Sequence, residues 1–346
     1  MLELHAAKGA FEALEEYLAA ERFWGRSGVV ADLYLGYGLS AAVRRTVLPA
    51  PPEPCPLPLL VCRIRPERAA PPLAHRRRTR FGEWQRTWDD GAYGGAIEAV
   101  RAAIARGDVY QANIVQHVSA PFSGDAAGLA AALRPLRPLH GRPLEGDGWA
   151  IVSASPERFL ARRGRLLRTM PIKGTRPAGE DVDGAKDAAE HVMIVDLERN
   201  DLARVCEPGS IRWPRLMQQR ELAGVTHLVS TVEGRLRADA SLAQILAATF
   251  PGGSVTGAPK IAAVDLIAAL EPVGRGASMG ALGVVRPDGD FDFALTIRTF
   301  ALVAGRAHLW VGGGIVWDSD AEAEIEESWV KARPLLAAVG GLVTAV

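Results

Sequence analysis

The amino-acid sequence predicts an α+β fold with two packed, largely antiparallel β-sheets flanked by helices. Strand-like stretches follow one another through tight turns in 149–170 and again in 279–316. Helix-like stretches, with apolar residues three and four positions apart, lie between these runs. Because the strands occur in hairpins and do not alternate singly with helices, antiparallel sheets are favoured over a doubly wound parallel fold.

The N-terminal 85 residues are expected to form a short region that packs on the core. A helix is predicted over 8–22, and proline-rich segments at 49–58 and 69–80 bracket a short strand. From about residue 92 the pattern becomes regular. We therefore divide the chain into a region 1–85 and a main domain 86–346.

The main domain is expected to begin with a helix and a long strand. Residues 91–109 carry apolar side chains at helical spacing, and residues 109–122 alternate as in a strand. The next stretch, 149–175, has the pattern of a strand, a break at Pro156 and a hairpin that turns near Gly164.

The C-terminal half mixes helices with further hairpins. Three strands are expected over 279–316, because two Gly-containing turns, at 287–289 and 304–305, interrupt the apolar pattern. The remaining predictions are a strand over 226–236 and helices over 184–206, 243–250, 258–273 and 319–339.

The overall charge gives no sign of a polyanionic partner. The 346 residues include 40 basic and 40 acidic side chains, and the formal net charge is zero. No long-range field therefore attracts nucleic acid or an anionic membrane. The one strong basic cluster, at 75–78, lies in a Pro/Ala-rich stretch and is interpreted as a solvated loop.

Targeting and redox signals are not found in the sequence. No apolar run reaches the roughly 18 residues of a membrane-spanning helix, and the first residues do not resemble a signal peptide. The three cysteines, Cys55, Cys62 and Cys206, form no CxxC pair and no disulfide framework. We expect a soluble, cytoplasmic protein.

Glu157 and Lys173 fall near matching positions of the predicted hairpin. Glu157 lies seven residues before Gly164 and Lys173 nine after it, so both are expected at the same end of the hairpin. The offset of two residues corresponds to roughly 7 Å along a strand. The pair could flank one reacting volume as an acid and an amine, or form a surface ion pair, and the spacing alone does not decide between these.

Three charged residues share one face of the last predicted helix. Glu324, Glu327 and Lys331 stand at i, i+3 and i+7. Glu190 lies on the apolar side of the helix predicted over 184–206, where a carboxylate needs a cation. Two glutamates from separate helices, without His or Cys ligands, suit Mg²⁺. The alternative is that the last helix simply has a solvated charged face.

Two glycine-rich segments could bind anions. Gly312, Gly313 and Gly314 are expected directly after a strand, where their backbone N–H groups could form a nest for a carboxylate. In the segment PGGSVTGAPK, Ser254 and Thr256 offer hydroxyl groups in a turn that opens a helix. Either cluster could instead be ordinary turn chemistry.

Two further side chains are candidates for a polar site. Arg298 is expected on a strand face with Thr296 and Asp292, a position suited to a bidentate contact with a carboxylate. His227 begins the strand predicted over 226–236, where a single histidine is more often a hydrogen-bonded packing residue. Together the candidates favour a metal-assisted enzyme that acts on a small polycarboxylate.

Several segments together resemble motifs of the chorismate-utilising enzyme family. In family order they are GDVYQANIVQ, SPERFL, PIKGTRP, EHVMIVDLERNDLARV, THLVSTVEG, FPGGSVTGAPK, IRT and GGGIVWDSDAEAEIEES, and they span roughly residues 90–335. The resemblance implies two packed antiparallel sheets around a deep, Mg²⁺-dependent chorismate site, so that 86–346 would be the catalytic domain.

The resemblance also implies roles for individual residues. Glu190 and Glu327 would hold Mg²⁺, and Glu324 would orient a metal-bound water. His227 would orient the substrate ring, Glu157 would protonate the departing C4 hydroxyl, and Lys173 would attack C2. The implied carboxylate-binding residues are Gly174, Thr175 and Ser254 for the ring carboxylate, and Arg298, Lys331 and Gly312, Gly313 and Gly314 for the enolpyruvyl carboxylate, with Gln111, Thr256 and Ser278 as further substrate-binding candidates.

Two positions indicate which reaction of the family to expect. Family members that use water as nucleophile carry a lysine where this chain has Gln111, and members that aminate C2 carry alanine where it has Lys173. With a lysine at that second position, the chain resembles the branch of the family that aminates C4 of chorismate, whose product leads to p-aminobenzoate and folate. Amination at C2 and a weakly catalytic chorismate-binding or scaffolding subunit are the alternatives.

The sequence also departs from the family pattern. Ser278 stands where the family usually has Tyr or Trp, so one contact to the enolpyruvyl carboxylate is in doubt. No glutaminase motif surrounds any of the three cysteines. Ammonia is therefore expected from solution or from a separate glutaminase chain in a heterodimer.

Overall fold

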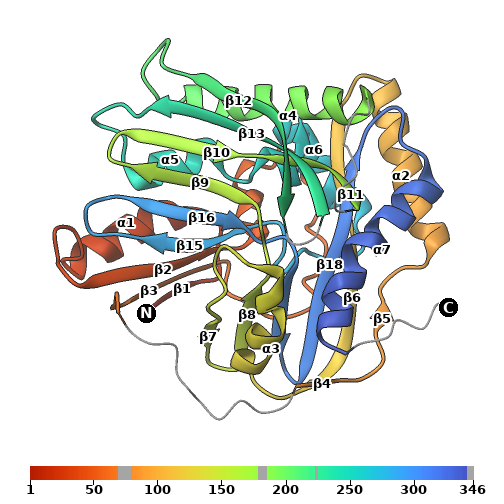
Figure 1. Ribbon diagram of the computed structural model, residues 1–346, viewed down its shortest axis with the longest axis horizontal. Coiled ribbons are helices and arrows are strands. Elements are labelled where there is room, and N and C mark those ends of the chain that lie inside the picture. Colours follow the sequence, from red (N-terminus) through yellow and green to blue (C-terminus); the bar gives the residue numbers. More distant parts are fainter. Residues whose placement is uncertain (69–78, 178–184, 223–224, 341–346) are drawn as a thin grey trace.

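The computed structural model describes residues 1–68, 79–177, 185–222 and 225–340. Within these ranges two antiparallel sheets stand side by side with helices around them, so the predicted α+β fold is confirmed (Figure 1). The side chains of 175–177, 185–187, 221–222 and 225 also lie outside the description, and so does the basic cluster at 75–78.

The larger sheet has ten strands among the described residues. Its order is β1-β3-β2-β15-β16-β9-β10-β13-β11, and β12 also pairs with β13. The strands are β1 (Leu2–Leu4), β2 (Val29–Leu35), β3 (Leu60–Pro66), β9 (Arg158–Arg163), β10 (Leu166–Met170), β11 (Ile172–Pro177), β12 (Arg212–Leu222), β13 (Val225–Arg235), β15 (Ala281–Val285) and β16 (Phe291–Leu295). The N-terminal strands thus continue the same sheet as β15 and β16, while the domain boundary near residue 85 stays a prediction.

The smaller sheet has eight strands within the described part of the chain. Its order is β14-β6-β18-β17-β8-β7, and β4 and β5 pair with β6. The strands are β4 (Arg80–Phe81), β5 (Gln85–Arg86), β6 (Gln111–Ser123), β7 (Leu144–Gly146), β8 (Trp149–Ser153), β14 (Gly257–Ala258), β17 (Thr299–Val303) and β18 (Arg306–Ile315).

Helices cover both sheets. They are α1 (Ala10–Ala20), α2 (Asp90–Ala105), α3 (Ala126–Leu133), α4 (Ala185–Ala203), α5 (Leu242–Thr249), α6 (Lys260–Leu270) and α7 (Ala321–Ala338), with short 3₁₀ turns η1 (Tyr37–Val43), η2 (Arg134–Leu136) and η3 (Gly253–Val255). Helix α7 packs on β18 and α2, whereas α4 packs on β13 and α5 (Figure 1).

Local sequence explains where the helices start. Asp89 accepts a hydrogen bond from the N–H of Ala92 at the start of α2, and Asp320 accepts one from the N–H of Ala323 at the start of α7. Both are side-chain caps of the kind that satisfies the free amides of a first turn. The predicted helices at 91–109 and 319–339 are thereby confirmed to within a few residues.

Two predictions about the strands were wrong. Residues 279–316 form four strands and not three, because the chain leaves β16 at Leu295 and enters β17 of the other sheet at Thr299. Arg298 lies in this crossing, off any strand, with a left-handed φ of 52°. The prediction of a bidentate position on a strand face with Thr296 and Asp292 is therefore incorrect, although Arg298 reaches the site described below.

The hairpin around Gly164 forms as predicted but is shorter. Strands β9 and β10 pair from Leu166↔Arg163 to Met170↔Arg158. Pro171 then separates β10 from β11, and Lys173 pairs with Leu228 of β13 instead of with β9.

The strands and helices bury one large apolar core and a smaller cluster. The large core includes Leu14, Tyr34, Tyr93 and Phe293, and so joins the N-terminal strands to the main domain. The smaller cluster packs α3 and α7 against the second sheet and includes Phe300 and Leu335. Within the described residues no helix is long and apolar enough to cross a membrane.

Candidate active site

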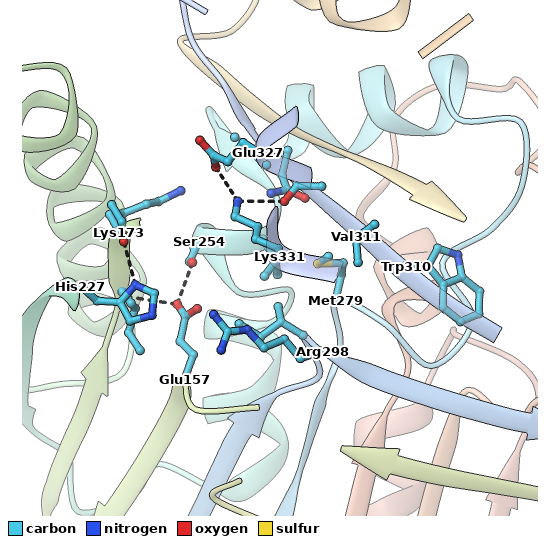
Figure 2. A pocket seen from close by; sticks show the side chains of 18 of the residues that line it. Glu157, Lys173, His227, Ser254, Met279, Arg298, Trp310, Val311, Glu327 and Lys331 are labelled. Carbon is cyan, nitrogen blue, oxygen red and sulfur yellow. Dashed lines mark hydrogen bonds and ion pairs between the residues drawn. The ribbon is translucent and has the colours of Figure 1, made fainter. Parts of the chain in front are cut away.

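A cavity of about 270 Å³ opens where the two sheets meet. Side chains reach it from β11 and β13 of the larger sheet, from β6 and β18 of the smaller sheet, and from α4 and α7. Thirteen of the residues singled out in the sequence line it: Glu157, Lys173, Gly174, Glu190, His227, Ser254, Arg298, Gly312, Gly313, Gly314, Glu324, Glu327 and Lys331. The sequence candidates are therefore gathered in one volume (Figure 2).

Glu157 is a buried acid in the wall of this cavity. Its side chain accepts hydrogen bonds from Ser254 Oγ at 2.8 Å and from the N–H of Ile172 at 3.3 Å. Burial raises the pKa of Glu157, although the Ser254 hydrogen bond and the charge of Lys173 act in the opposite direction. A carboxyl group that holds its proton above the usual range is suited to general-acid catalysis.

Lys173 lies close enough to Glu157 to affect its ionisation, although it does so from β11, which pairs with β13, and not from the second strand of the predicted hairpin. A Cβ placed on Gly314 would be 3.3 Å from Lys173 Nζ and 2.0 Å from Gln111 Nε2. The amine and the amide therefore converge over Gly314, a position that only glycine can occupy without displacing Gln111. Lys173 lines the same cavity as Glu157, which supports the interpretation of an acid and an amine that flank one volume.

Gln111 itself is fully buried and does not line the cavity. Its amide oxygen and nitrogen have no hydrogen-bond partner among the described residues. A buried amide without partners is costly, so this side chain is available to a small polar group beside Lys173.

His227 is neutral and has a defined tautomer. Its Nδ1 lies 2.7 Å from the carbonyl oxygen of Gly174, and because a carbonyl oxygen only accepts, Nδ1 carries the proton. Burial lowers the pKa of His227, with the Gly174 hydrogen bond opposing. Nε2 is thus a hydrogen-bond acceptor, a role that suits contact with a substrate hydroxyl.

Three carboxylates reach the cavity from α4 and α7. A Cβ placed on Gly313 would lie 3.4 Å from Glu324 Oε2, from Glu327 Oε1 and from Lys331 Nζ alike. The oxygens of Glu324 and Glu327 are therefore within about twice that distance of each other, and Glu190 faces the same cavity from α4.

These carboxylates fit Mg²⁺ in the chemistry of their donors. All three are hard oxygen ligands of the kind that Mg²⁺ prefers, and they lie in a cavity that His227 also lines. In the described part of the chain, no three such side chains are already close enough to surround an ion. Lys331 Nζ lies 2.6 Å from Glu327 Oε1, so a metal would displace this ammonium from its carboxylate.

Two cationic side chains, Arg298 and Lys331, line the same cavity as the carboxylates. Arg298 projects into the cavity beside Glu157, and Lys331 lies across it on α7 (Figure 2). Lys331 Nζ also donates to the carbonyl of Gly312 at 3.0 Å. A substrate with two carboxylates can thus be held at two separated positive groups.

The predicted position of the glycine cluster, directly after a strand, was wrong. Gly312, Gly313 and Gly314 lie within β18 and pair with Val115, Ile114 and Asn113 of β6. None has a positive φ, so they do not form the predicted anion-binding nest. Their lack of side chains serves close packing instead, since a Cβ on Gly312 would lie 2.0 Å from the carbonyl oxygen of Ile114.

Two other candidates lie behind the cavity wall. Thr256 and Ser278 are fully buried and do not line the cavity, and Ser278 Oγ donates to the carbonyl of Thr296 at 3.3 Å. Direct substrate contact at these two positions is therefore not supported. Thr175 belongs to β11, but its side chain lies outside the described residues.

The sequence did not reveal the apolar end of the cavity. Met279, Trp310 and Val311 line it beyond Arg298 (Figure 2). Asn113 was also missed, although it stands two residues after Gln111 on β6 and a period of two would have placed it on the same face. The apolar residues carried no comparable signal, because each looks like an ordinary core residue.

The fold and the site together define the class of protein to which this chain belongs. The family model of chorismate binding enzymes matches residues 55–337, and the chain belongs to this family. The resemblance inferred from the motifs is confirmed.

Two groups of curated relatives are similar to the same extent. Anthranilate synthase component 1 of Streptomyces coelicolor is 39% identical over 80% of this chain and 56% of its own length. Aminodeoxychorismate synthase component 1 of Klebsiella aerogenes is 40% identical over 73% of this chain and 59% of its own length. The chain thus spans a little over half the length of the curated relatives it matches.

Solved structures agree on the fold. Anthranilate synthase component I of Streptococcus pneumoniae superposes with a TM-score of 0.80 at 27% identity, covering 92% of this chain and 84% of that one. An isochorismate synthase of Bacillus anthracis, described as putative, superposes with a TM-score of 0.75 at 22% identity, over 98% of this chain and 91% of that one, and supports the fold alone.

Proposed function

We propose that this chain is the component 1 of an aminodeoxychorismate synthase, which converts chorismate and ammonia to 4-amino-4-deoxychorismate. The observation that supports this most is the place of Lys173, an amine that lines the same cavity as the acid Glu157 and the cationic Arg298 and Lys331. The relatives that carry this name match about as well as those named anthranilate synthase. The proposal therefore rests on the site and not on the degree of identity.

The proposed reaction has two allylic steps. Lys173 Nζ adds to C2 of chorismate, the ring double bond shifts, and the C4 hydroxyl leaves as water with the proton of Glu157. Ammonia then adds at C4, the double bond returns, the lysine leaves C2 as an amine, and a proton released from the new C4 ammonium restores the acid Glu157. Hydroxide is a poor leaving group, so the raised pKa of Glu157, caused by burial, keeps the required proton in place.

The remaining residues would bind and orient the substrate. Arg298 and Lys331 would hold the enolpyruvyl carboxylate, and His227 Nε2 would accept a hydrogen bond from the ring. Glu190, Glu324 and Glu327 would hold Mg²⁺, which when bound neutralises the ring carboxylate and draws charge from it.

Ammonia would come from a separate glutaminase chain. Cys55, Cys62 and Cys206 are all buried and free. Burial raises the pKa of Cys55 and of Cys62 to about 12 and that of Cys206 to about 11. Such thiols are not ionised at neutral pH, so none of the three is suited to attack glutamine.

Anthranilate synthase is the second candidate, because relatives of that name are equally similar. The two reactions differ in whether the enolpyruvyl group is lost. We therefore expect the chain, given chorismate, Mg²⁺ and ammonia, to consume chorismate without releasing pyruvate in a coupled lactate dehydrogenase assay. Stoichiometric pyruvate together with fluorescent anthranilate would refute the proposal. Chorismate binding without turnover would instead support a scaffolding subunit.

A further inference from the structure

The outer face of the larger sheet carries a groove lined by arginines, apart from the active-site cavity. One cavity of about 380 Å³ is lined by Arg158, Arg168, Met170, Pro214, Arg215, Arg220, Thr231 and Glu233. A second cavity of about 220 Å³ shares Arg158 and Arg168 with the first and adds Arg163 and Asp292. Because they share these two arginines, the two cavities adjoin over β9, β10, β13 and β12, which are neighbouring strands of the larger sheet (Figure 1), and together they are called the groove below.

The carboxylates in this groove are already neutralised. Glu233 accepts from Arg168 at 2.8 Å and from Arg212 at 2.8 Å. Although burial opposes its ionisation, these hydrogen bonds hold the pKa of Glu233 below its ordinary value. Asp292 accepts from Arg158 Nε at 3.0 Å and from Arg158 Nη2 at 3.3 Å.

Two arginines of the groove have no acidic partner among the described residues. Arg215 forms no ion pair, and Arg220 contacts only the amide oxygen of Gln218, at 3.4 Å. Five arginines and two carboxylates thus line the two cavities. This excess of like charge around one concavity is unfavourable without counter-charge.

The backbone of β12 directs Arg215 toward the groove. The pairing of β12 with β13 shifts register between Arg212 and Arg215, and again between Arg215 and Gln218. Met217 has a left-handed φ of 50°, and its N–H is fixed by Ser230 Oγ at 2.9 Å. Bulges change the direction in which a strand's side chains point, and Arg215, which has no acidic partner among the described residues, lies between two of them.

We propose that this groove is a binding site for a compact polyanion, a small molecule with two or more phosphate or carboxylate groups. Guanidinium groups bind such oxygens in bidentate fashion. A volume of about 380 Å³ falls in the range of small-molecule sites. The site is independent of the proposed reaction, because none of its residues belongs to the active-site cavity.

The test is isothermal titration of the full chain with pyrophosphate and, separately, with citrate. Binding of either is expected, and comparison of the two distinguishes phosphate from carboxylate ligands. In the double variant Arg215→Gln/Arg220→Gln, affinity should fall about a hundredfold or more, since the loss of each charge-assisted contact weakens binding by about tenfold or more. Arg215→Lys should give an intermediate affinity, because it keeps the charge and loses the bidentate geometry.

The control is Arg101→Gln/Arg106→Gln, which removes the same charge from α2 and from the residue that follows it, and neither position lines the groove. It should leave the affinity unchanged. All variants should retain ammonia-dependent chorismate turnover and the circular dichroism of the wild type. Absence of binding by the wild type, or equal loss in the α2 control, would overturn the proposal.

Discussion

Lys173 is the single side chain on which the proposed product depends. Its amine and the buried amide of Gln111 converge over Gly314, and Glu157 lies near enough for their charges to interact. An acid and a nucleophile are therefore arranged around one small volume. The neighbouring carboxylates and cations bind substrate but do not by themselves select C4 over C2.

The first prediction concerns Lys173→Ala. C4 amination should fall by about three orders of magnitude, because a nucleophile contributes to the chemical step itself. Chorismate affinity, measured by titration, should change little, since the binding groups remain. The matched control is Lys8→Ala, an exposed lysine in the N-terminal segment before α1. Unchanged turnover in Lys173→Ala would show that the amine is not the nucleophile.

The second prediction concerns pH. Glu157 must be protonated to act as an acid, so activity should decline as pH rises through its raised pKa. The hydrogen bond from Ser254 acts to lower that pKa. In Ser254→Ala the alkaline limb of kcat against pH should consequently move to higher pH. A limb that moves to lower pH, or stays in place, would contradict the assignment.

Sequence reasoning worked best for residues with a distinctive chemistry. Glu157, Lys173, Glu190 and the α7 face were found because charges at those spacings are unusual in a core. Arg298 was placed on a strand because its neighbours alternate, although the chain there crosses between two sheets. Whether a polar residue faces the cavity or lies behind it, as Ser278 does, depends on tertiary packing that spacing does not encode.

At the scale of elements, a buried ion pair holds the cavity wall together. Arg275 donates to both oxygens of Glu271 and to the carbonyl of Val255 at 2.9 Å, and also to that of Asn113 at 2.5 Å. Glu271 in turn accepts from the N–H of Val115 at 3.0 Å. The pair therefore joins α6, η3 and β6 behind the substrate cavity.

The third prediction follows from this pair. Arg275→Met should lower the free energy of unfolding by about 3–5 kcal/mol, because it leaves a buried carboxylate without a cation. The double variant Arg275→Met/Glu271→Met should recover part of that loss. Urea unfolding measures both, and Arg101→Met at the exposed pair with Glu98 should cost under about 1 kcal/mol. Equal losses at the two pairs would contradict this role.

Element types were predictable and their partners were not. The helices and the β9–β10 hairpin follow from local spacing and caps. Strand β11 pairs with β13 and not with β9, because Pro171 interrupts the chain after Met170. Local pattern cannot choose among such distant partners. Strand β12 was not predicted at all, since its polar and irregular sequence lacks clean alternation.

At the scale of the whole molecule, stability should depend on two buried histidines in the smaller sheet. His117 Nε2 lies 3.1 Å from His308 Nδ1, and His117 Nδ1 lies 2.6 Å from Thr87 Oγ1. Burial lowers the pKa of His117 to about 3 and that of His308 to about 4. Both rings are therefore neutral in the folded protein at pH 7.

The fourth prediction is the sign of the pH dependence. Below about pH 6.5 the unfolded chain binds protons at these histidines and the folded chain does not. The free energy of unfolding therefore decreases as the pH decreases, by about 1.4 kcal/mol per pH unit for each histidine. The loss continues until the folded pKa values are passed. Urea unfolding from pH 7 to pH 4.5 should show a shallower slope in His308→Gln than in the wild type. An unchanged slope would exclude this pair as the cause.

The central claim is that the chain aminates chorismate at C4 and retains the enolpyruvyl group. Its most direct test is NMR of the product formed from chorismate, Mg²⁺ and ¹⁵N-labelled ammonia. We predict a product whose ¹⁵N is bonded to C4, with the enolpyruvyl methylene signals still present. A ¹⁵N label at C2, with loss of those signals, would contradict the account.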